Sequence, residues 1–202
     1  MRAILLVALF ALSACTGLLP GSGPAPDLYT LSPASRFPEG LPQTAWQLLI
    51  DEPSAVGGLD SNRIAVQPTT NEIKYFGDVR WVERATRMIQ GLLVESFERS
   101  KAVAAVDRYA VGMRADYILK SELRDFQTEL FDSPKTPTIH VRLTAKLVRA
   151  GRQETVWTHD FSAKVVARAS TAPDVVAAFD QALGQVMAEI VSTTVRETAT
   201  TR

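Results

Sequence analysis

The sequence predicts an α+β domain: a mainly antiparallel sheet with a long-stranded meander and two amphipathic helices packed on one face. The first observation is the alternation in Ile139–Leu147, where apolar side chains occupy the odd positions and polar or charged ones the even positions. A period of two is typical of a strand with one buried face. The second is a pair of helical apolar stripes, made of Val82, Thr86, Ile89, Leu93 and Phe97, and of Val176, Phe179, Leu183, Val186 and Ile190.

Long segments flank the alternating strand on both sides. Ala115–Leu130 precedes it and Glu154–Ala167 follows it, and turn residues separate the three at Ser133-Pro134 and Ala150-Gly151. Segments of this length joined by short turns favour an antiparallel meander.

Shorter elements precede the meander. Asp78 is the expected N-cap of the first helix, which should end near Ser100, and the second helix should run from about Pro173 to Thr198. Short strands are expected over residues 28–31, 46–51, 62–67, 72–76 and 103–106.

The N-terminus predicts a targeting segment. Arg2 is followed by the apolar run Ala3–Leu12, which is too short to span a membrane but fits a secretory signal. The next residues, Leu12-Ser13-Ala14-Cys15, resemble the lipobox of bacterial lipoproteins. The resemblance implies cleavage after Ala14, an S-diacylglycerol group on Cys15 and an N-acyl chain such as palmitate on its new amino group. The alternative is a plain secretory signal with an incidental cysteine.

The sequence divides into three parts on this reading. Residues 1–14 are the lipoprotein signal peptide, 15–27 a flexible tether and 28–202 the folded domain. The tether is rich in Gly and Pro and has no apolar period. Thr16 follows the cysteine, and because Asp at that position marks inner-membrane retention in bacteria that sort lipoproteins, Thr favours the outer membrane.

Composition excludes several classes of function. Lys plus Arg and Asp plus Glu are both 22, so the formal net charge is zero, which disfavours nucleic acid as a partner. A single cysteine allows no intramolecular disulfide and no thiolate metal site. We find no metal-ligand spacing, phosphate loop or activated nucleophile, and therefore expect no enzyme activity, metal or cofactor.

The two histidines are expected to be structural. His140 shares a strand face with Arg142 and Lys146, which indicates a solvated surface. His159 is expected at the margin of the core, and because consecutive strand residues point to opposite faces, it cannot pair with Asp160.

Three aromatic residues form the remaining candidate site. Tyr75, Phe76 and Trp81 cluster before the first predicted helix. They could dock a partner, because rigid aromatic side chains dominate interface energetics. The alternative is that they cap the core, and the sequence leaves the two open.

The order of these features resembles the ABC-type transport auxiliary lipoproteins, which include the PqiC-like proteins. The resemblance rests on Leu28–Leu31, on Gly58–Val66, on Ile73–Gly77 and on Trp81, followed by the helical stripe. Phe76 in place of the more usual second Tyr, and Val82 after Trp81, are mild departures.

The resemblance implies a lipoprotein that works with an MCE-domain protein and with ABC permease and ATPase subunits. Family members take part in moving lipids or other hydrophobic molecules across a Gram-negative envelope. The expected location is the inner leaflet of the outer membrane, facing the periplasm. A lipid-binding carrier and an outer-membrane assembly lipoprotein are the alternatives, and a homo-oligomer is compatible with the sequence.

Overall fold

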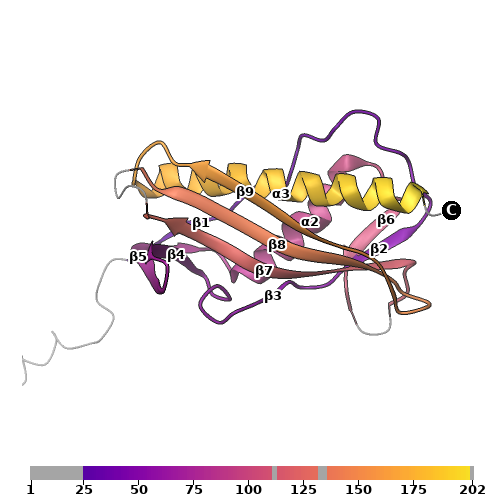
Figure 1. Cartoon of the computed structure of the whole chain (residues 1–202), viewed down its shortest axis with the longest axis horizontal. Helices are drawn as coiled ribbons and strands as arrows, with labels where there is room; N and C mark the ends of the chain where they lie inside the picture. Colours follow the sequence, from indigo (N-terminus) through magenta and orange to yellow (C-terminus); the bar gives the residue numbers. More distant parts are fainter. Residues whose placement is uncertain (1–24, 111–112, 132–135, 201–202) are drawn as a thin grey trace, which may run out of the picture.

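A computed structural model describes residues 25–110, 113–131 and 136–200. These residues form a mixed nine-stranded sheet and two helices, which confirms the predicted α+β class. The strands are β1 (Asp27–Tyr29), β2 (Gln47–Ile50), β3 (Ser54–Ala55), β4 (Arg63–Thr69), β5 (Glu72–Trp81), β6 (Ala105–Arg108), β7 (Tyr117–Glu129), β8 (Thr138–Arg149) and β9 (Glu154–Val166). The helices are α2 (Ala85–Ser100) and α3 (Ala172–Thr200) (Figure 1).

The predicted meander is confirmed. Strands β7 and β8 pair from Tyr117 opposite Arg149 to Glu129 opposite Thr138, and β9 pairs antiparallel with the other edge of β8. The apolar residues that alternate with polar ones in the sequence of β8 are the residues that the fold buries. Its fully buried apolar side chains are Ile139, Val141, Leu143, Ala145 and Leu147.

The second edge of β7 holds three short strands in succession. Strands β2, β3 and β4 all run parallel to it: Leu48 lies opposite Tyr117, Ser54 opposite Glu122 and Ala65 opposite Gln127. Strand β6 pairs parallel with β2, and β1 with β5. The sheet is therefore mixed: the meander and the β4–β5 hairpin are antiparallel, while these parallel pairs join segments that are distant in the sequence.

A β-bulge divides β7 into two halves. Leu123 lies opposite Leu143 and Asp125 opposite Arg142, so Arg124 is the extra residue. An extra residue reverses which side chains face the core. Leu123 faces inward before the bulge and Phe126 after it, and both are buried.

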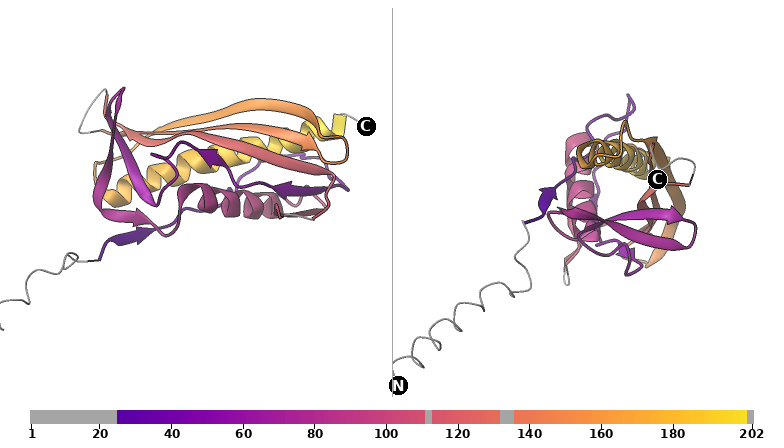
Figure 2. Two further views of the ribbon diagram at one scale, coloured as in Figure 1. Left: turned by 90° about the horizontal axis from the view of Figure 1, so that it is seen from below. Right: turned by 90° about the vertical axis from the view of Figure 1, so that its left-hand side faces the viewer.

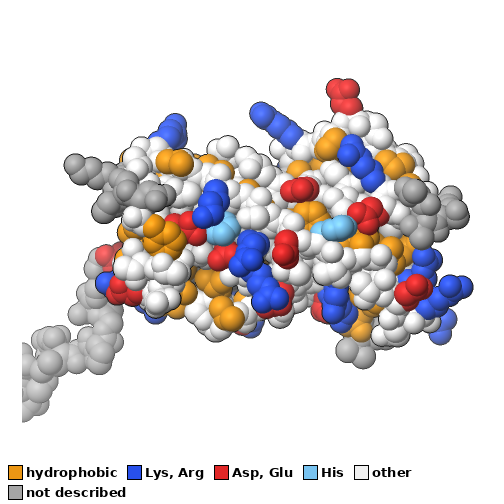
Figure 3. Space-filling view, viewed as in Figure 1, with side chains coloured by type: hydrophobic (Ala, Val, Ile, Leu, Met, Phe, Trp, Pro, Cys, Tyr) orange, Lys and Arg blue, Asp and Glu red, His pale blue; other side chains and the backbone are white. Residues whose placement is uncertain are grey.

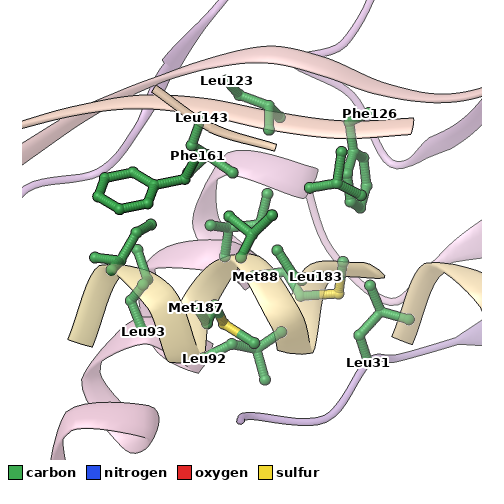
Figure 4. Close-up of a cluster of buried hydrophobic side chains, with 14 of the residues drawn as sticks. Leu31, Met88, Leu92, Leu93, Leu123, Phe126, Leu143, Phe161, Leu183 and Met187 are labelled. Atoms are coloured by element: carbon green, nitrogen blue, oxygen red, sulfur yellow. The ribbon is translucent and has the colours of Figure 1, made fainter. Parts of the chain in front are cut away.

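The helices cover the concave side of the curved sheet (Figure 2). Helix α3 packs along β8 and β9, helix α2 contacts β2 and β6, and the two helices touch each other. Leu183 and Met187 of α3 meet Leu92 and Met88 of α2 beneath the sheet (Figure 4). The space between the layers is filled by apolar side chains.

Helix α3 is long and apolar enough to cross a membrane over Ala172–Ala199, with a mean hydropathy of 1.2. It is nevertheless the central helix of the domain. Of the stripe read from the sequence, Phe179, Leu183, Val186 and Ile190 are fully buried within the fold, whereas Val176, near the start of the helix, is only partly buried. Burial against the sheet accounts for its apolar composition.

The predicted start of the first helix is wrong. Asp78 is an exposed residue of β5, and α2 begins at Ala85. The backbone N–H of Trp81 donates to the Asn62 carbonyl at 2.8 Å, and that of Val82 to the Tyr29 carbonyl at 2.9 Å. These long-range bonds hold the chain extended past Asp78, so local capping preference does not decide the boundary.

Candidate functional site

The predicted lipidation site, Cys15, and the predicted cleavage position after Ala14 lie outside the described residues. The described chain enters the fold at β1, where Asp27 lies opposite Val79 and Tyr29 opposite Trp81. The described chain is thus joined through its first strand to the outer edge of β5. Strand β1 and the β4–β5 hairpin lie at one end of the molecule, and the C-terminus of α3 at the other (Figure 2).

Trp81 belongs to the core. Its side chain is 0% exposed, and its ring centroid lies 5.3 Å from that of Phe179 and 5.6 Å from that of Phe126. Phe126 and Phe179 are themselves 4.9 Å apart, so the three rings form one closed group that joins β5, β7 and α3. Of the two alternatives for Trp81, the structure supports the packing role.

Tyr75 and Phe76 are separate from that group. Both are half-buried, and as consecutive residues of β5 they point to opposite faces. The Tyr75 hydroxyl donates to the Gly58 carbonyl at 3.1 Å, and the Arg63 guanidinium carbon lies 3.7 Å from the centre of the Tyr75 ring. Tyr75 therefore ties β5 to the turn that precedes β4.

Exposed apolar side chains surround this turn. Val56 is 62% exposed and Ile73 44% exposed. Backbone N–H groups of Leu59 and Asp60 both donate to the Val56 carbonyl, while Ile73 and the Tyr75 hydroxyl border Gly58. We call Val56, Ile73 and Tyr75 the hairpin patch. Sequence reasoning missed Val56 and Ile73, because a single exposed aliphatic residue in a turn or edge strand has no distinguishing pattern.

A polar junction holds the same turn against the start of α2. Arg84 binds both carboxylate oxygens of Asp60, at 2.9 and 2.8 Å, and lies 3.3 Å from Glu52. The Thr86 hydroxyl is 2.9 Å from both carboxylates. Bidentate arginine–carboxylate pairs fix geometry as well as charge. Asp60, which lies in the family-like stretch Gly58–Val66, thus joins the turn between β3 and β4 to the start of α2.

A second polar cluster lies on the convex face of the sheet. Glu129 of β7 is largely buried and accepts from Lys164 at 2.7 Å, with His140 Nδ1 at 2.8 Å. Arg142 donates to Asp125. In the space-filling view, His side chains lie among Lys, Arg, Asp and Glu side chains on the face that it shows (Figure 3). The solvated surface expected for His140 is instead a paired network, because β7 and β9 supply partners on both sides.

The network lowers the pKa of Asp125. Partial burial alone would raise it, but hydrogen bonds from Gln127 and Arg142, together with electrostatic contributions from His140 and Arg142, favour the carboxylate more strongly. The ordinary value is 3.8. Asp125 is therefore held as an anion on the sheet surface.

The other histidine was expected at the margin of the core, but the His159 side chain is 45% exposed. His159 stacks on Trp157 with ring centroids 5.3 Å apart, and its Nε2 is 2.8 Å from a carboxylate oxygen of Glu197. Asp160 points to the other face, where it accepts from Thr144. Within residues 25–110, 113–131 and 136–200, no group of three or more His, Cys, Asp or Glu could hold a metal ion.

Comparison with known families gives a match over most of the chain. The sequence model of the family described as ABC-type transport auxiliary lipoprotein component matches residues 29–191. This chain belongs to that family.

Solved structures share the fold of this chain. A crystal structure of a Xanthomonas campestris protein is 32% identical, covers 86% of this chain and 97% of its own, and superposes with a TM-score of 0.80. A hypothetical protein of Chlamydia trachomatis shares the fold, with 7% identity, 78% and 99% coverage and a TM-score of 0.53.

A curated relative is longer than this chain. A Bradyrhizobium diazoefficiens protein is 27% identical over 180 residues, which is 87% of this chain but 47% of the relative. The chain thus spans about half the length of that protein. The auxiliary lipoprotein domain is the part they share.

The recognisable part of the auxiliary lipoprotein sequence is mainly structural. Asp60 anchors the turn to α2, Tyr75 anchors it to β5, and Trp81 fills the core. The paired network of Asp125, Glu129 and His140 was not identified from the sequence. One feature of the sequence could have revealed this network. In β7 the apolar residues of the core change from odd-numbered positions, up to Leu123, to an even-numbered position at Phe126, which indicates the bulge and places the acidic residues on the convex face.

Removing the Trp81 ring should destabilise the domain. Trp81→Ala is expected to lower the free energy of unfolding by about 3–5 kcal/mol, because it opens a cavity between Phe126 and Phe179. Denaturant unfolding followed by circular dichroism measures this. Trp81→Phe should lose less, and the neighbouring exposed Val82→Ala should change stability little. A stable Trp81→Ala variant would contradict the packing role.

The Asp125 carboxylate should make stability depend on acidic pH. Asp125→Asn is expected to lower the free energy of unfolding at neutral pH by about 1 kcal/mol, through loss of charge-assisted hydrogen bonds partly open to water. Because the folded pKa lies below 3.8, this contribution is present above about pH 4–5 and disappears as the pH falls through the folded value.

Unfolding titrations between about pH 2 and 7 measure the effect. The difference between wild type and Asp125→Asn should shrink toward acid. The exposed Asp78→Asn variant of β5 is the matched control. A difference that stays constant with pH would show that the carboxylate charge does not matter.

Proposed function

We propose that this protein is a lipid-anchored, non-catalytic auxiliary component of an envelope transport system. In that system an ABC permease and ATPase work with an MCE-domain protein to move lipids or other hydrophobic molecules between the two membranes. The family match over residues 29–191 carries the proposal. The MCE partner and the hydrophobic cargo rest on the family resemblance of the sequence.

The proposed anchor is Cys15 of the mature N-terminus. Residues 1–14 would be removed, the segment from Cys15 to the start of β1 would form the tether, and the domain would stand in the periplasm. The predicted tether over 15–27 is thus shorter at its end, because Asp27 already pairs with Val79. Thr16 favours the outer membrane over the inner membrane. The entry of the described chain at β1, on the sheet edge, supports this arrangement because it leaves the tether attached at one end of the domain.

The hairpin patch is the proposed partner surface. Tyr75 is the residue that it retains from the aromatic cluster of the sequence, and Val56 and Ile73 add exposed apolar area around Gly58. Aromatic and aliphatic side chains held on a rigid hairpin suit an interface, since little conformational freedom is lost on binding. The Tyr75 hydrogen bond to Gly58 and the Asp60–Arg84 pair supply that rigidity.

Replacing the cysteine should release the protein from the membrane. Cys15→Ser removes the acyl chains, each buried methylene of which contributes about 0.8 kcal/mol to membrane binding. The protein is expected to move from the membrane fraction to the soluble fraction on ultracentrifugation, and mass spectrometry should find no acylated N-terminal peptide. Thr16→Ser is the control. Unchanged fractionation would rule out lipidation as the main attachment.

Partner capture tests the transport assignment. The full chain, purified from its own membranes in mild detergent, is expected to recover MCE-domain and ABC subunits. Combining Val56→Asp with Ile73→Asp should reduce recovery by about tenfold, because charge at the centre of an apolar contact is costly. Immunoprecipitation with quantitative mass spectrometry measures this.

Val166→Asp is the matched control for capture, since Val166 is also 62% exposed but lies at the end of β9. It should leave recovery unchanged. Recovery of no transport subunit by the wild type would overturn the proposed function. Equal loss with Val166→Asp would remove only the assignment of the hairpin patch.

A further inference from the structure

A hollow opens at the end of the domain opposite β1. It has a volume of about 540 Å³ and lies where β7 begins, β8 turns into β9 and α3 ends. Its lining residues are Trp46, Ala115, Asp116, Tyr117, Arg149, Gly151, Arg152 and Thr198. None of these residues belongs to the hairpin patch or to the junction at Asp60.

Two arginines line the hollow without an acidic partner. Among the described residues, neither Arg149 nor Arg152 takes part in an ion pair, whereas Arg84, Arg142 and Arg168 each do. The Arg149 Nε is buried and has no hydrogen-bond acceptor. Its guanidinium carbon lies 5.4 Å from the centre of the Tyr117 ring, so the ring supports the cation from one side.

The indole N–H of Trp46 is a third hydrogen-bond donor near the hollow without an acceptor. Trp46 is 8% exposed, packs edge-on against Tyr117 at 5.3 Å, and its buried indole N–H has no partner. Trp81 and Trp157 also bury an unpartnered indole N–H, so the indole alone decides nothing. What distinguishes this site is the combination of an indole with two unpaired guanidinium groups around one hollow.

The one carboxylate that lines the hollow, that of Asp116, offsets only one of the two arginine charges. Asp116 lines the hollow, but one of its carboxylate oxygens accepts the backbone N–H of Gln47 at 2.8 Å. Glu154 lies opposite Arg149 in the β8–β9 register and forms no ion pair with it. The local balance favours a positive charge that an incoming anion would complete.

The geometry points to a binding site for a phosphate group, and we propose that Arg149 and Arg152 hold it. Guanidinium groups match phosphate oxygens through paired N–H donors and remain charged at all relevant pH values. The volume accommodates a phosphate ester with a small organic substituent. The group could belong to a lipid headgroup or to a free phosphate, and both share this chemistry.

A structural alternative exists for the same residues. The hollow borders Thr198 in the last turn of α3, where a cation also stabilises the negative end of the helix dipole. That role requires no ligand. It predicts a change in stability on removing the charge and no saturable binding of phosphate, so binding measurements separate the two.

Isothermal titration of the full mature chain in detergent tests the site. The probes are inorganic phosphate and dihexanoyl phosphatidic acid, the latter below its micelle concentration. Saturable binding of either is expected, and combining Arg149→Gln with Arg152→Gln should weaken it by about tenfold or more. Tighter binding of the lipid identifies a headgroup site, and equal binding identifies a site for phosphate itself.

Arg87→Gln is the control for charge, because Arg87 is an exposed residue of α2 that pairs with Glu83. It should leave binding unchanged. Circular dichroism checks that each variant is folded, and the single variant Arg152→Gln, on an exposed turn, keeps the test available if the double variant unfolds. No saturable binding by the wild type, or equal weakening in Arg87→Gln, would overturn the proposal. Neither outcome bears on capture of transport subunits, which tests the proposed function separately.

Discussion

Strand β7 is paired along both of its edges, and the rest of the domain depends on that pairing. One edge carries the whole of β8, while the other carries β2, β3 and β4 in succession. Each short strand would be unstable alone, since a few backbone hydrogen bonds do not offset the entropy of ordering the chain. By sharing one long template, they bring the β4–β5 hairpin, the turn at Gly58 and the start of α2 into fixed positions.

The bulge at Arg124 changes which side chains of β7 face the helices and which face the convex surface. Before it, Leu119 and Leu123 face the helices, and after it Phe126 does. The shift places Phe126 against Trp81 and Phe179, and in the same step turns Asp125 outward toward Arg142. One inserted residue therefore links the closed aromatic group to the charged network on the convex face. Closing the bulge would bury a carboxylate and expose a phenyl ring, a change unfavourable on both faces.

Sequence reasoning succeeded where the pattern is local and failed where distant partners decide. The alternation of Ile139–Leu147 and the stripe of α3 are visible in one segment, and both elements formed as predicted. Asp78 looked like a helix cap because the hydrogen bonds of Trp81 and Val82 to Asn62 and Tyr29 cannot be read locally. His140 looked solvated for the same reason, since its partners come from β7 and β9. The sequence singled out Asp60 and Tyr75 as family-like residues. Their structural role is seen only in the folded domain, where both hold the turn at Gly58.

The lengths of β8 and α3 set the long dimension of the domain. At about 3.3 Å per residue, the 12 residues of β8 span roughly 40 Å, and the 29 residues of α3 at 1.5 Å each run about as far beside it. Helix α3 packs along β8 and β9 and buries one apolar stripe there, so the long strands and the helix extend side by side. Strand β1 and the hairpin lie at one end, and the hollow of Arg149 at the other. On the estimate from β8 and α3, the hollow therefore lies roughly 40 Å from the end of the domain at which the described chain begins.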